Sequence, residues 1–475
     1  MKVLYCTSEA APFASTGGLA EVAGSLPQAL RLRLIGCRVV MPLYEDIPQA
    51  LRDNMKFVTS LSVPVAWRRQ YCGVFETHVG GVIVYLIDNQ YYFKRHGLYG
   101  HFDDAERFAF FSRAALEMLP YIDFKPDILH ANDWQTALVP VYFSIFYANG
   151  DWYRGMKTVL TIHNIQYQGK YGEELIEDVL GIPKASLPLL QFDKCVNFMK
   201  GAIECANRVT TVSPTYAEEI LDPWYSYGLD GILRERSWKL SGILNGIDTA
   251  VYDPETDPDL YATYSAEDLS GKATNKLELQ KRLALEPAER KPLIAMVTRM
   301  VAQKGLDLVR GSIDALLNTT DCQFVILGSG DWEYETFFRA LQDRYPGRVC
   351  SCFGFVPELS HKIYAGADLL LMPSKSEPCG LSQMIALRYG TIPVVRATGG
   401  LKDSVTDSGD GQGNGFTFQT YDGGDMLHAI GRAIEGYGNP EGWETLMRRA
   451  MACDYSWGRS AKEYIRLYRS LLKES

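Results

Sequence analysis

A regular alternation of apolar strand-like segments with helix-like segments constrains the fold of this chain more than any other feature. Short apolar runs in the first half predict strands at residues 3–7, 37–42, 82–87, 127–130, 158–163 and 209–212, the third of them ending an antiparallel excursion. Helices are predicted at about 19–34 and 108–119, and Ser213-Pro214 predicts a further helix start, because Pro is favoured in the first helical turn. Strands that alternate with helices form a parallel sheet covered on both faces, so the expected fold class is α/β.

The same alternation restarts in the second half of the chain. Strands are predicted at 293–298, 322–327, 349–353, 369–372 and 392–395, with a helix from about Lys304. Between the halves, the polar stretch 252–270 contains several Pro and Asp residues and predicts a linker. Because 475 residues exceed what one core usually organises, we expect two doubly wound domains that face each other across a cleft.

Composition excludes some classes of partner. Asp plus Glu (57) exceed Lys plus Arg (48), which gives a net charge of −9 and argues against binding to nucleic acid or to anionic membranes. No signal-peptide pattern and no apolar run of about 18 residues is present, so we expect a cytoplasmic protein. The ten cysteines are irregularly spaced, and Cys350-Ser351-Cys352 is too tight for a Cys-x-x-Cys zinc pair, so reduced thiols are expected.

Loops that follow strands are the candidate site, because ligands of open α/β sheets bind beyond the carboxyl ends of the strands. In Ser15-Thr16-Gly17-Gly18-Leu19, two glycines open a helix whose N–H groups can approach an anion, with a plain turn as the alternative. His163 ends one strand, and Asp133 lies in the loop after another. Either residue can serve a ligand or have a purely structural role.

Two loops of the second half carry charge. Arg299 and Lys304 lie close to a helix N-terminus, whose partial positive charge repels cations. A phosphate bound between the two side chains would make this placement favourable. Solvated cations are the alternative. The segment from Glu377 to Leu381 leads into a helix at Ser382, whose N-terminus can hold a phosphate while Glu377 contacts hydroxyls or a developing cation. A helix-capping carboxylate is the alternative for Glu377.

Together these loops predict a diphosphate site without a magnesium cage. No Asp-x-Asp occurs in a suitable loop, and the phosphate-binding pattern G-x-x-x-x-G-K-[ST] is absent. Cationic side chains and helix ends could neutralise a leaving diphosphate in place of a metal ion. We therefore expect no metal and no cofactor.

Several motifs make a family resemblance specific. They are Thr16-Gly17-Gly18-Leu19-Ala20-Glu21-Val22, Tyr92-Phe93-Lys94-Arg95-His96-Gly97-Leu98-Tyr99-Gly100, His130-Ala131-Asn132-Asp133-Trp134, Thr161-Ile162-His163-Asn164, Asn245-Gly246-Ile247-Asp248, Glu377-Pro378-Cys379-Gly380-Leu381 and Arg388-Tyr389-Gly390-Thr391. Over nearly its whole length the chain resembles bacterial glycogen synthases and plant starch synthases. The resemblance implies a GT-B architecture: a Rossmann-like acceptor domain (1–245) with a helix at about 456–475 packing back on it, and a donor domain (246–455).

The resemblance also implies an activity and roles for individual residues. Glucose would pass from ADP-glucose to the non-reducing 4-hydroxyl of an α-1,4-glucan such as glycogen, with retention and without a metal. Glu377, His163, Arg299 and Lys304 would be catalytic, Arg299 and Lys304 holding the diphosphate and Glu377 stabilising the oxocarbenium-like transition state. The wider set at the substrates would be Ser15, Gly17, Gly18, Tyr92, Arg95, Asp133, Asn164, Asn245, Phe355, Cys379, Gly380, Leu381 and Ser382, with Phe355 near the adenine and Tyr92 and Arg95 on the acceptor side.

One departure from the family pattern affects the donor site. The family has a lysine where this chain has Ser15, and a serine offers a hydrogen bond but no charge. Since charge-assisted contacts are about twice as strong as neutral ones, weaker donor binding is expected. UDP-glucose as donor and a weakened glucan-binding paralogue stay open as alternatives, as does a covalent nucleophile in place of same-face substitution.

Overall fold

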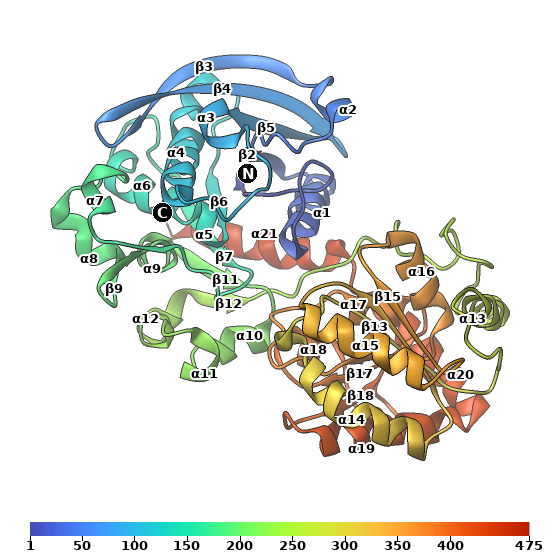
Figure 1. Cartoon of the computed structure of the whole chain (residues 1–475). Helices are drawn as coiled ribbons and strands as arrows, with labels where there is room; N and C mark the ends of the chain where they lie inside the picture. Colours follow the sequence, from blue (N-terminus) through green and yellow to red (C-terminus); the bar gives the residue numbers. More distant parts are fainter. Residues whose placement is uncertain (475) are drawn as a thin grey trace. The chain divides into compact units, whose positions relative to one another are not determined.

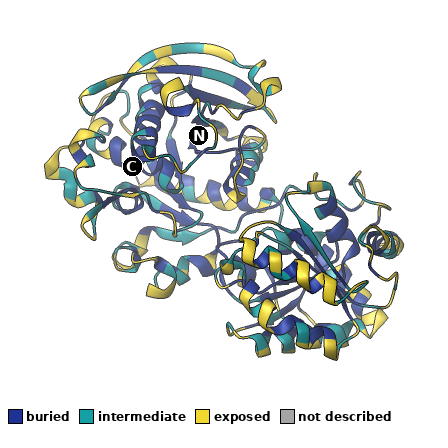
Figure 2. Ribbon diagram, viewed as in Figure 1, coloured by how far each residue is buried: buried dark blue, intermediate teal, exposed yellow. Residues whose placement is uncertain are grey.

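The computed structural model describes residues 1–474, which form two compact units (Figure 1). The first unit comprises Met1–Gly246 together with the C-terminal segment that begins at Trp457, and the second comprises Ile247–Ser456. Each unit is built on its own mostly or wholly parallel sheet. The central strands of both sheets are mainly buried, whereas the strands Lys56–Val65 and Arg68–Val79 are largely half-buried or exposed, and the helices expose their outer faces (Figure 2).

The large sheet of the first unit has nine strands in the order β12-β11-β7-β6-β1-β2-β5-β4-β3. Their bounds are β1 (Lys2–Cys6), β2 (Gly36–Pro42), β3 (Lys56–Val65), β4 (Arg68–Val79), β5 (Val82–Asp88), β6 (Ile128–Asn132), β7 (Lys157–Ile162), β11 (Arg208–Thr211) and β12 (Leu240–Gly242). Strands β12 to β5 pair in parallel, whereas β3 and β4 pair antiparallel and lead into β5. The predicted antiparallel excursion is therefore confirmed. A small separate sheet has the order β8-β10-β9, formed by β8 (Lys170–Tyr171), β9 (Gln191–Phe192) and β10 (Cys195–Asn197).

The first unit also contains helices. They are α1 (Gly18–Leu32), α2 (Gln49–Arg52), α3 (Gln90–Phe93), α4 (Asp104–Glu117), α5 (Asp133–Thr136), α6 (Leu138–Tyr142), α7 (Leu175–Asp178), α8 (Leu187–Leu190), α9 (Phe198–Cys205), α10 (Pro214–Glu219), α11 (Pro223–Ser226), α12 (Asp230–Glu235) and α21 (Trp457–Lys473). The last of these, red in Figure 1, packs against α1. Its buried Tyr468 places its hydroxyl 2.7 Å from Nδ1 of His130, so the C-terminal helix is tied to β6.

The sheet of the second unit has six parallel strands in the order β15-β14-β13-β16-β17-β18. The strands are β13 (Leu293–Val297), β14 (Gln323–Gly328), β15 (Val349–Phe353), β16 (Leu369–Met372), β17 (Ile392–Arg396) and β18 (Phe416–Phe418). The helices are α13 (Ser270–Arg282), α14 (Leu306–Thr319), α15 (Trp332–Arg344), α16 (Pro357–Gly366), α17 (Ser382–Arg388), α18 (Gly399–Ser404), α19 (Gly423–Tyr437) and α20 (Pro440–Met451). The strand order reverses between β13 and β16, which makes this pair the topological switch point of the sheet.

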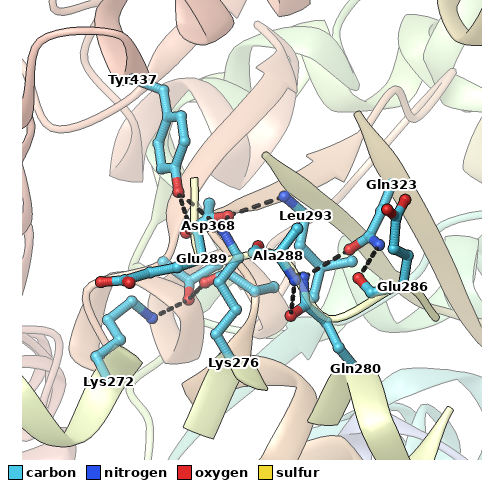
Figure 3. Close-up of polar contacts among 12 residues, drawn as sticks. Lys272, Lys276, Gln280, Glu286, Ala288, Glu289, Leu293, Gln323, Asp368 and Tyr437 are labelled. Carbon is cyan, nitrogen blue, oxygen red and sulfur yellow. Dashed lines mark hydrogen bonds and ion pairs between the residues drawn. The ribbon is translucent and has the colours of Figure 1, made fainter. Parts of the chain in front are cut away.

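A buried polar network fixes α13 to this sheet (Figure 3). The ammonium group of Lys276 lies 2.6 Å from Oδ2 of Asp368, which also accepts a hydrogen bond from the N–H of Leu293 at 2.8 Å. Lys276 donates to the hydroxyl of Tyr437 as well, at 2.8 Å. Because every member has a partner, these contacts offset much of the desolvation cost of burying the charges.

The prediction of a linker at 252–270 is wrong. Asp257 and Tyr264 are buried within the second unit. The hydroxyl of Tyr264 donates to the carbonyl of Tyr389 at 2.7 Å, and Asp257 lies 2.6 Å from Nδ1 of His361. The polar side chains of this stretch close turns and make buried hydrogen bonds. A folded segment can therefore have the polar composition that is typical of a linker.

No helix within residues 1–474 is both long and apolar enough to cross a membrane.

Candidate functional site

The predicted charged residues of the second unit meet at its switch point. Lys304 lies in the loop after β13, and Glu377 lies in the loop after β16. The Nζ of Lys304 is 2.6 Å from Oε2 of Glu377, and the hydroxyl of Ser374 donates to the same oxygen at 3.0 Å. Both charged side chains are largely buried, with exposed fractions of 17% and 7%. Because little of this ion pair is exposed to solvent, it differs from a solvated surface pair, and its geometry is well defined.

Three loops hold this ion pair by close backbone packing. Gly305 has φ +75°, and a Cβ on it would lie 2.0 Å from the carbonyl oxygen of Pro373. Gly399 has φ +45°, and a Cβ there would lie 1.9 Å from the carbonyl oxygen of Glu377. The N–H of Gly400 donates to that same oxygen at 3.1 Å. Only glycine fits at these contacts, which explains the glycine pair at 399–400.

Arg299 and Phe355 are presented to solvent near the same edge of the sheet. Arg299 is exposed and makes no ion pair with any residue in the described range 1–474. Its loop is joined to the loop after β14, because the N–H of Met300 donates to the carbonyl of Ser329 at 2.8 Å. Phe355 follows the edge strand β15, which is separated from β13 by β14, and is 92% exposed. An exposed cation and an exposed aromatic ring at the carboxyl end of the same sheet are suited to a phosphate and a base.

The predicted segment from Cys379 to Ser382 leads into α17. Cys379 is buried, and Gly380 has φ +72°, which turns the chain into the helix. Leu381 is the residue before the helix, and Ser382 is its first residue, with its hydroxyl 3.3 Å from the carbonyl of Val297. This segment therefore joins the β16 loop to the end of β13.

In the first unit, Asp133 organises the ends of β6 and β7. Its Oδ1 accepts the N–H of His163 at 2.7 Å and that of Asn164 at 3.3 Å. Asp133 has φ +55°, a conformation that Asp tolerates better than most residues. Burial raises the pKa of its carboxyl to about 7, even though the two N–H groups act to lower it. The predicted residues Asp133, His163 and Asn164 are thus brought together.

The imidazole of His163 is held neutral. Burial lowers its pKa to about 3, and Nε2 lies 2.9 Å from Oδ1 of Asn132. Because that oxygen accepts, Nε2 carries the hydrogen and Nδ1 keeps its lone pair. The ring offers a hydrogen-bond acceptor and no charge.

The loop from Ser15 to Gly18 is exposed at the start of α1. Ideal Cβ atoms on Gly17 and Gly18 would contact nothing within 4 Å, so these glycines leave open space at the helix N-terminus. The sequence analysis missed Glu9, a buried carboxylate that accepts both the N–H and the hydroxyl of Thr16 at 2.7 Å. Burial raises the pKa of Glu9. A single Glu after β1 belongs to no recognisable sequence motif. Its position at the end of a predicted strand is the one signal that could have marked it as a candidate site residue.

Asn245 is buried, and its Oδ1 has no hydrogen-bond partner among residues 1–474. An orphaned buried acceptor costs stability unless a ligand or water supplies a donor. This observation fits the predicted binding role of Asn245.

The prediction that Tyr92 lines a substrate site is wrong for this structure. Its side chain is fully buried, and its hydroxyl donates to Oε1 of Glu106 at 2.5 Å. Burial is the main cause of a raised Tyr92 pKa. Arg95 is instead held by two hydrogen bonds to Asp103, at 2.6 and 2.8 Å, beside the exposed ring of Tyr91.

One group of side chains could hold a metal ion. Ligand atoms of Asp257, Asp259 and His361 lie within 4.8 Å of one another. However, the Asp257 carboxylate already accepts from the hydroxyl of Tyr389 and lies against the His361 ring. Both contacts are to Oδ2 of Asp257, and the N–H of Asp259 donates to Oδ1 at 2.9 Å, so both oxygens of this carboxylate already have partners.

The two parallel-sheet units, each with polar groups at its switch point, have the GT-B-type fold of glycosyltransferases. Two family models match the chain: "Starch synthase catalytic domain" at residues 2–235 and "Glycosyl transferases group 1" at residues 279–447. The chain belongs to the glycogen and starch synthase family, and it is an enzyme that transfers glucosyl units in glycogen synthesis.

Individual relatives cover the whole chain. It is 52% identical to a glycogen synthase of Geobacillus thermodenitrificans, over 100% of this chain and 98% of the relative. It is 49% identical to a glycogen synthase of Bacillus cereus, over 100% of both chains. The catalytic domain of starch synthase IV from Arabidopsis thaliana, solved bound to ADP and acarbose, superposes with a TM-score of 0.91 at 38% identity and covers 99% of each chain. Sucrose-phosphate synthase from Thermosynechococcus elongatus, at 17% identity and a TM-score of 0.63 over both full chains, shows the fold alone.

Proposed function

We propose that this enzyme transfers glucose from ADP-glucose to the non-reducing 4-hydroxyl of an α-1,4-glucan, with retention at the anomeric carbon and release of ADP. The observation that carries the proposal is the largely buried pair of Lys304 and Glu377, with the exposed Arg299 in the same loop after β13 as Lys304. The names of the bacterial relatives support glycogen as the acceptor, and the starch synthase solved with ADP and acarbose supports an adenine nucleotide and a glucan-like ligand.

Arg299 and Lys304 would hold the diphosphate of the donor. As the bond from the anomeric carbon to the diphosphate breaks, negative charge grows on the leaving group. Preorganised cations in a partly buried site stabilise that charge without reorganising. We propose that they do this without a metal ion.

Glu377 would stabilise the positive charge that develops on the glucosyl ring. Its carboxylate is fixed by Lys304 and Ser374, so it could not swing away as the ring charge develops. The proton of the acceptor hydroxyl would pass to an oxygen of the leaving diphosphate on the same face, which keeps the anomeric configuration and balances the charge. In the first unit, the neutral His163 ring and Asp133, which accepts the backbone N–H of His163, would position sugar hydroxyls.

The main test is a donor panel with glycogen as acceptor. Incorporation of labelled glucose from ADP-glucose should exceed that from UDP-glucose by at least about tenfold, a difference of about 1.4 kcal/mol in the barrier. The rate should be unchanged when EDTA is added. Proton NMR of the product should show α-linkages. Preference for UDP-glucose, loss of activity in EDTA or β-linked product would each overturn the corresponding part of the proposal.

A further inference from the structure

Two cysteine sulfurs are in contact on the edge strand of the second unit. Sγ of Cys350 lies 3.8 Å from Sγ of Cys352, and both residues are half-buried on β15. Residues two apart in a strand share one face, so the two side chains point the same way. Ser351 between them faces α15, because its hydroxyl donates to the carbonyl of Phe338 at 2.9 Å. The thiols therefore lie on the other face of the sheet.

The environment of the pair favours a thiolate on one sulfur. The hydrogen bond between the two sulfurs lowers the pKa of Cys352 against the effect of burial, and the positive charge of Arg282 acts in the same direction as the hydrogen bond. The pKa of Cys350 is raised by that same hydrogen bond and by burial. A thiolate beside a second thiol is the arrangement that thiol–disulfide exchange requires.

The pair also lies next to the loop that ends in Phe355. β15 is an edge strand and pairs only with β14 in the described sheet. After β15, the N–H of Gly354 donates to the carbonyl of Gly328 at 3.0 Å, and Gly354 has φ +110°. The exposed Phe355 follows directly. A change in the length of β15 would therefore move Phe355.

We propose that Cys350 and Cys352 are a site of covalent modification: a small-molecule disulfide oxidises them to an intrastrand disulfide, and the closed ring weakens nucleotide binding at Phe355. The Cys352 thiolate attacks the reagent and displaces one thiolate, which forms a mixed disulfide. Cys350 loses its proton and attacks Sγ of Cys352 in this mixed disulfide. The second half of the reagent leaves and takes up the proton as a thiol. Two protein thiols are oxidised and one reagent disulfide is reduced, so electrons and protons balance.

Strand geometry gives the reason for the effect on Phe355. Residues two apart in a strand have Cα atoms about 6.6 Å apart, at the upper limit of what a disulfide spans. Closing the bond pulls the strand ends together, and β15 can buckle because it is bonded on one side only. The effect on nucleotide binding rests on the proposed function, whereas the oxidation itself does not.

The full-length protein is treated with oxidised glutathione, digested with trypsin and examined by mass spectrometry. Residues 349–362 form one tryptic peptide that contains Cys350 and Cys352 and no other cysteine. The expected result is a loss of about 2 Da in this peptide, reversed by dithiothreitol. Only glutathione adducts, or no change, would overturn the proposed disulfide.

ADP affinity is then measured by calorimetry before and after oxidation. The Kd should rise about tenfold on oxidation, as expected when a base loses an aromatic contact, and should recover on reduction. C352S should bind ADP normally and show no rise, while the control C195S, at another half-buried cysteine, should respond as the wild type does. A disulfide without a change in Kd would overturn the link to Phe355. Failure of the reduced protein to bind ADP at all would instead count against the proposed function.

Discussion

The ammonium group of Lys304 is bound to the carboxylate of Glu377 at 2.6 Å, although 73 residues separate them in the chain. The two side chains come from loops after neighbouring strands on either side of the switch point, so the fold creates the pair. A cation already neutralised by Glu377 gives less attraction to a diphosphate than a free one. The exposed Arg299 is therefore expected to be the stronger anchor for the donor.

Replacing Glu377 with Gln should separate catalysis from binding. The amide keeps the shape and an acceptor oxygen but removes the charge that stabilises the ring cation, so kcat should fall about 10²- to 10³-fold. Because Lys304 then has no counter-charge, the Kd for ADP should stay equal or decrease. Steady-state kinetics and calorimetry check both. The control E333Q, which breaks an exposed ion pair with Arg310, should change neither. A higher Kd with normal kcat would contradict the role of Glu377.

Much of the framework could be predicted from the sequence because it depends on local patterns. Buried parallel strands are continuous apolar runs, and the predicted ranges fall on β13, β14 and β16 to within two residues. The positions of Arg299, Lys304 and Glu377 at strand ends followed from the same pattern. What could not be predicted was the ion pair itself, since contact across a switch point is set by the strand order and not by spacing in the chain.

The failures have a different cause, which is burial that residue type does not reveal. Tyr91 and Tyr92 are adjacent tyrosines, yet Tyr91 is exposed and Tyr92 is buried against the aromatic ring of Phe110. The family resemblance placed Tyr92 on the acceptor side, and nothing in the sequence distinguishes its burial from that of Tyr91. Glu9 was not predicted as a site residue, because the sequence does not distinguish a buried glutamate from one on the surface.

Replacing Arg299 with Ala should weaken binding of the diphosphate. Loss of a charge-assisted contact to phosphate should raise the Kd for ADP about 10- to 100-fold. R299K should be intermediate, because lysine keeps the charge but not the forked geometry. Binding of adenosine, which has no phosphate, should change less than about twofold. R310A, at an exposed arginine of α14, is the matched control. Equal losses for ADP and adenosine would show that Arg299 does not contact the phosphates.

Introducing a lysine at Ser15 should strengthen donor binding. Ser15 is exposed just before the N-terminus of α1, and the side chain that the family pattern places there is cationic. S15K should lower the Kd for ADP-glucose about three- to tenfold, and the gain should shrink at high salt because an exposed charge is screened. S15Q has nearly the same length without the charge and should leave the Kd unchanged. If S15Q and S15K gave the same Kd, contact area rather than charge would be responsible.

Replacing Asp133 with Asn should change how stability depends on pH. The pKa of Asp133 is about 7 in the folded chain against about 3.9 when unfolded, so the folded state holds the proton more tightly. A raised carboxyl pKa stabilises the fold fully below about pH 4, and that contribution is lost as pH rises to about 7. Between pH 5 and pH 8 the wild type should lose about 3 kcal/mol relative to D133N. Urea unfolding of both proteins at the two pH values measures this difference.

Asparagine suits this comparison because it keeps the local structure. Asn tolerates the positive φ of residue 133, and its side-chain oxygen can still accept the N–H groups of His163 and Asn164. D151N, at an exposed aspartate, should show the pH dependence of the wild type. If the difference between wild type and D133N were constant from pH 5 to pH 8, the carboxyl would be ionised throughout. The two N–H groups would then outweigh burial in setting its charge.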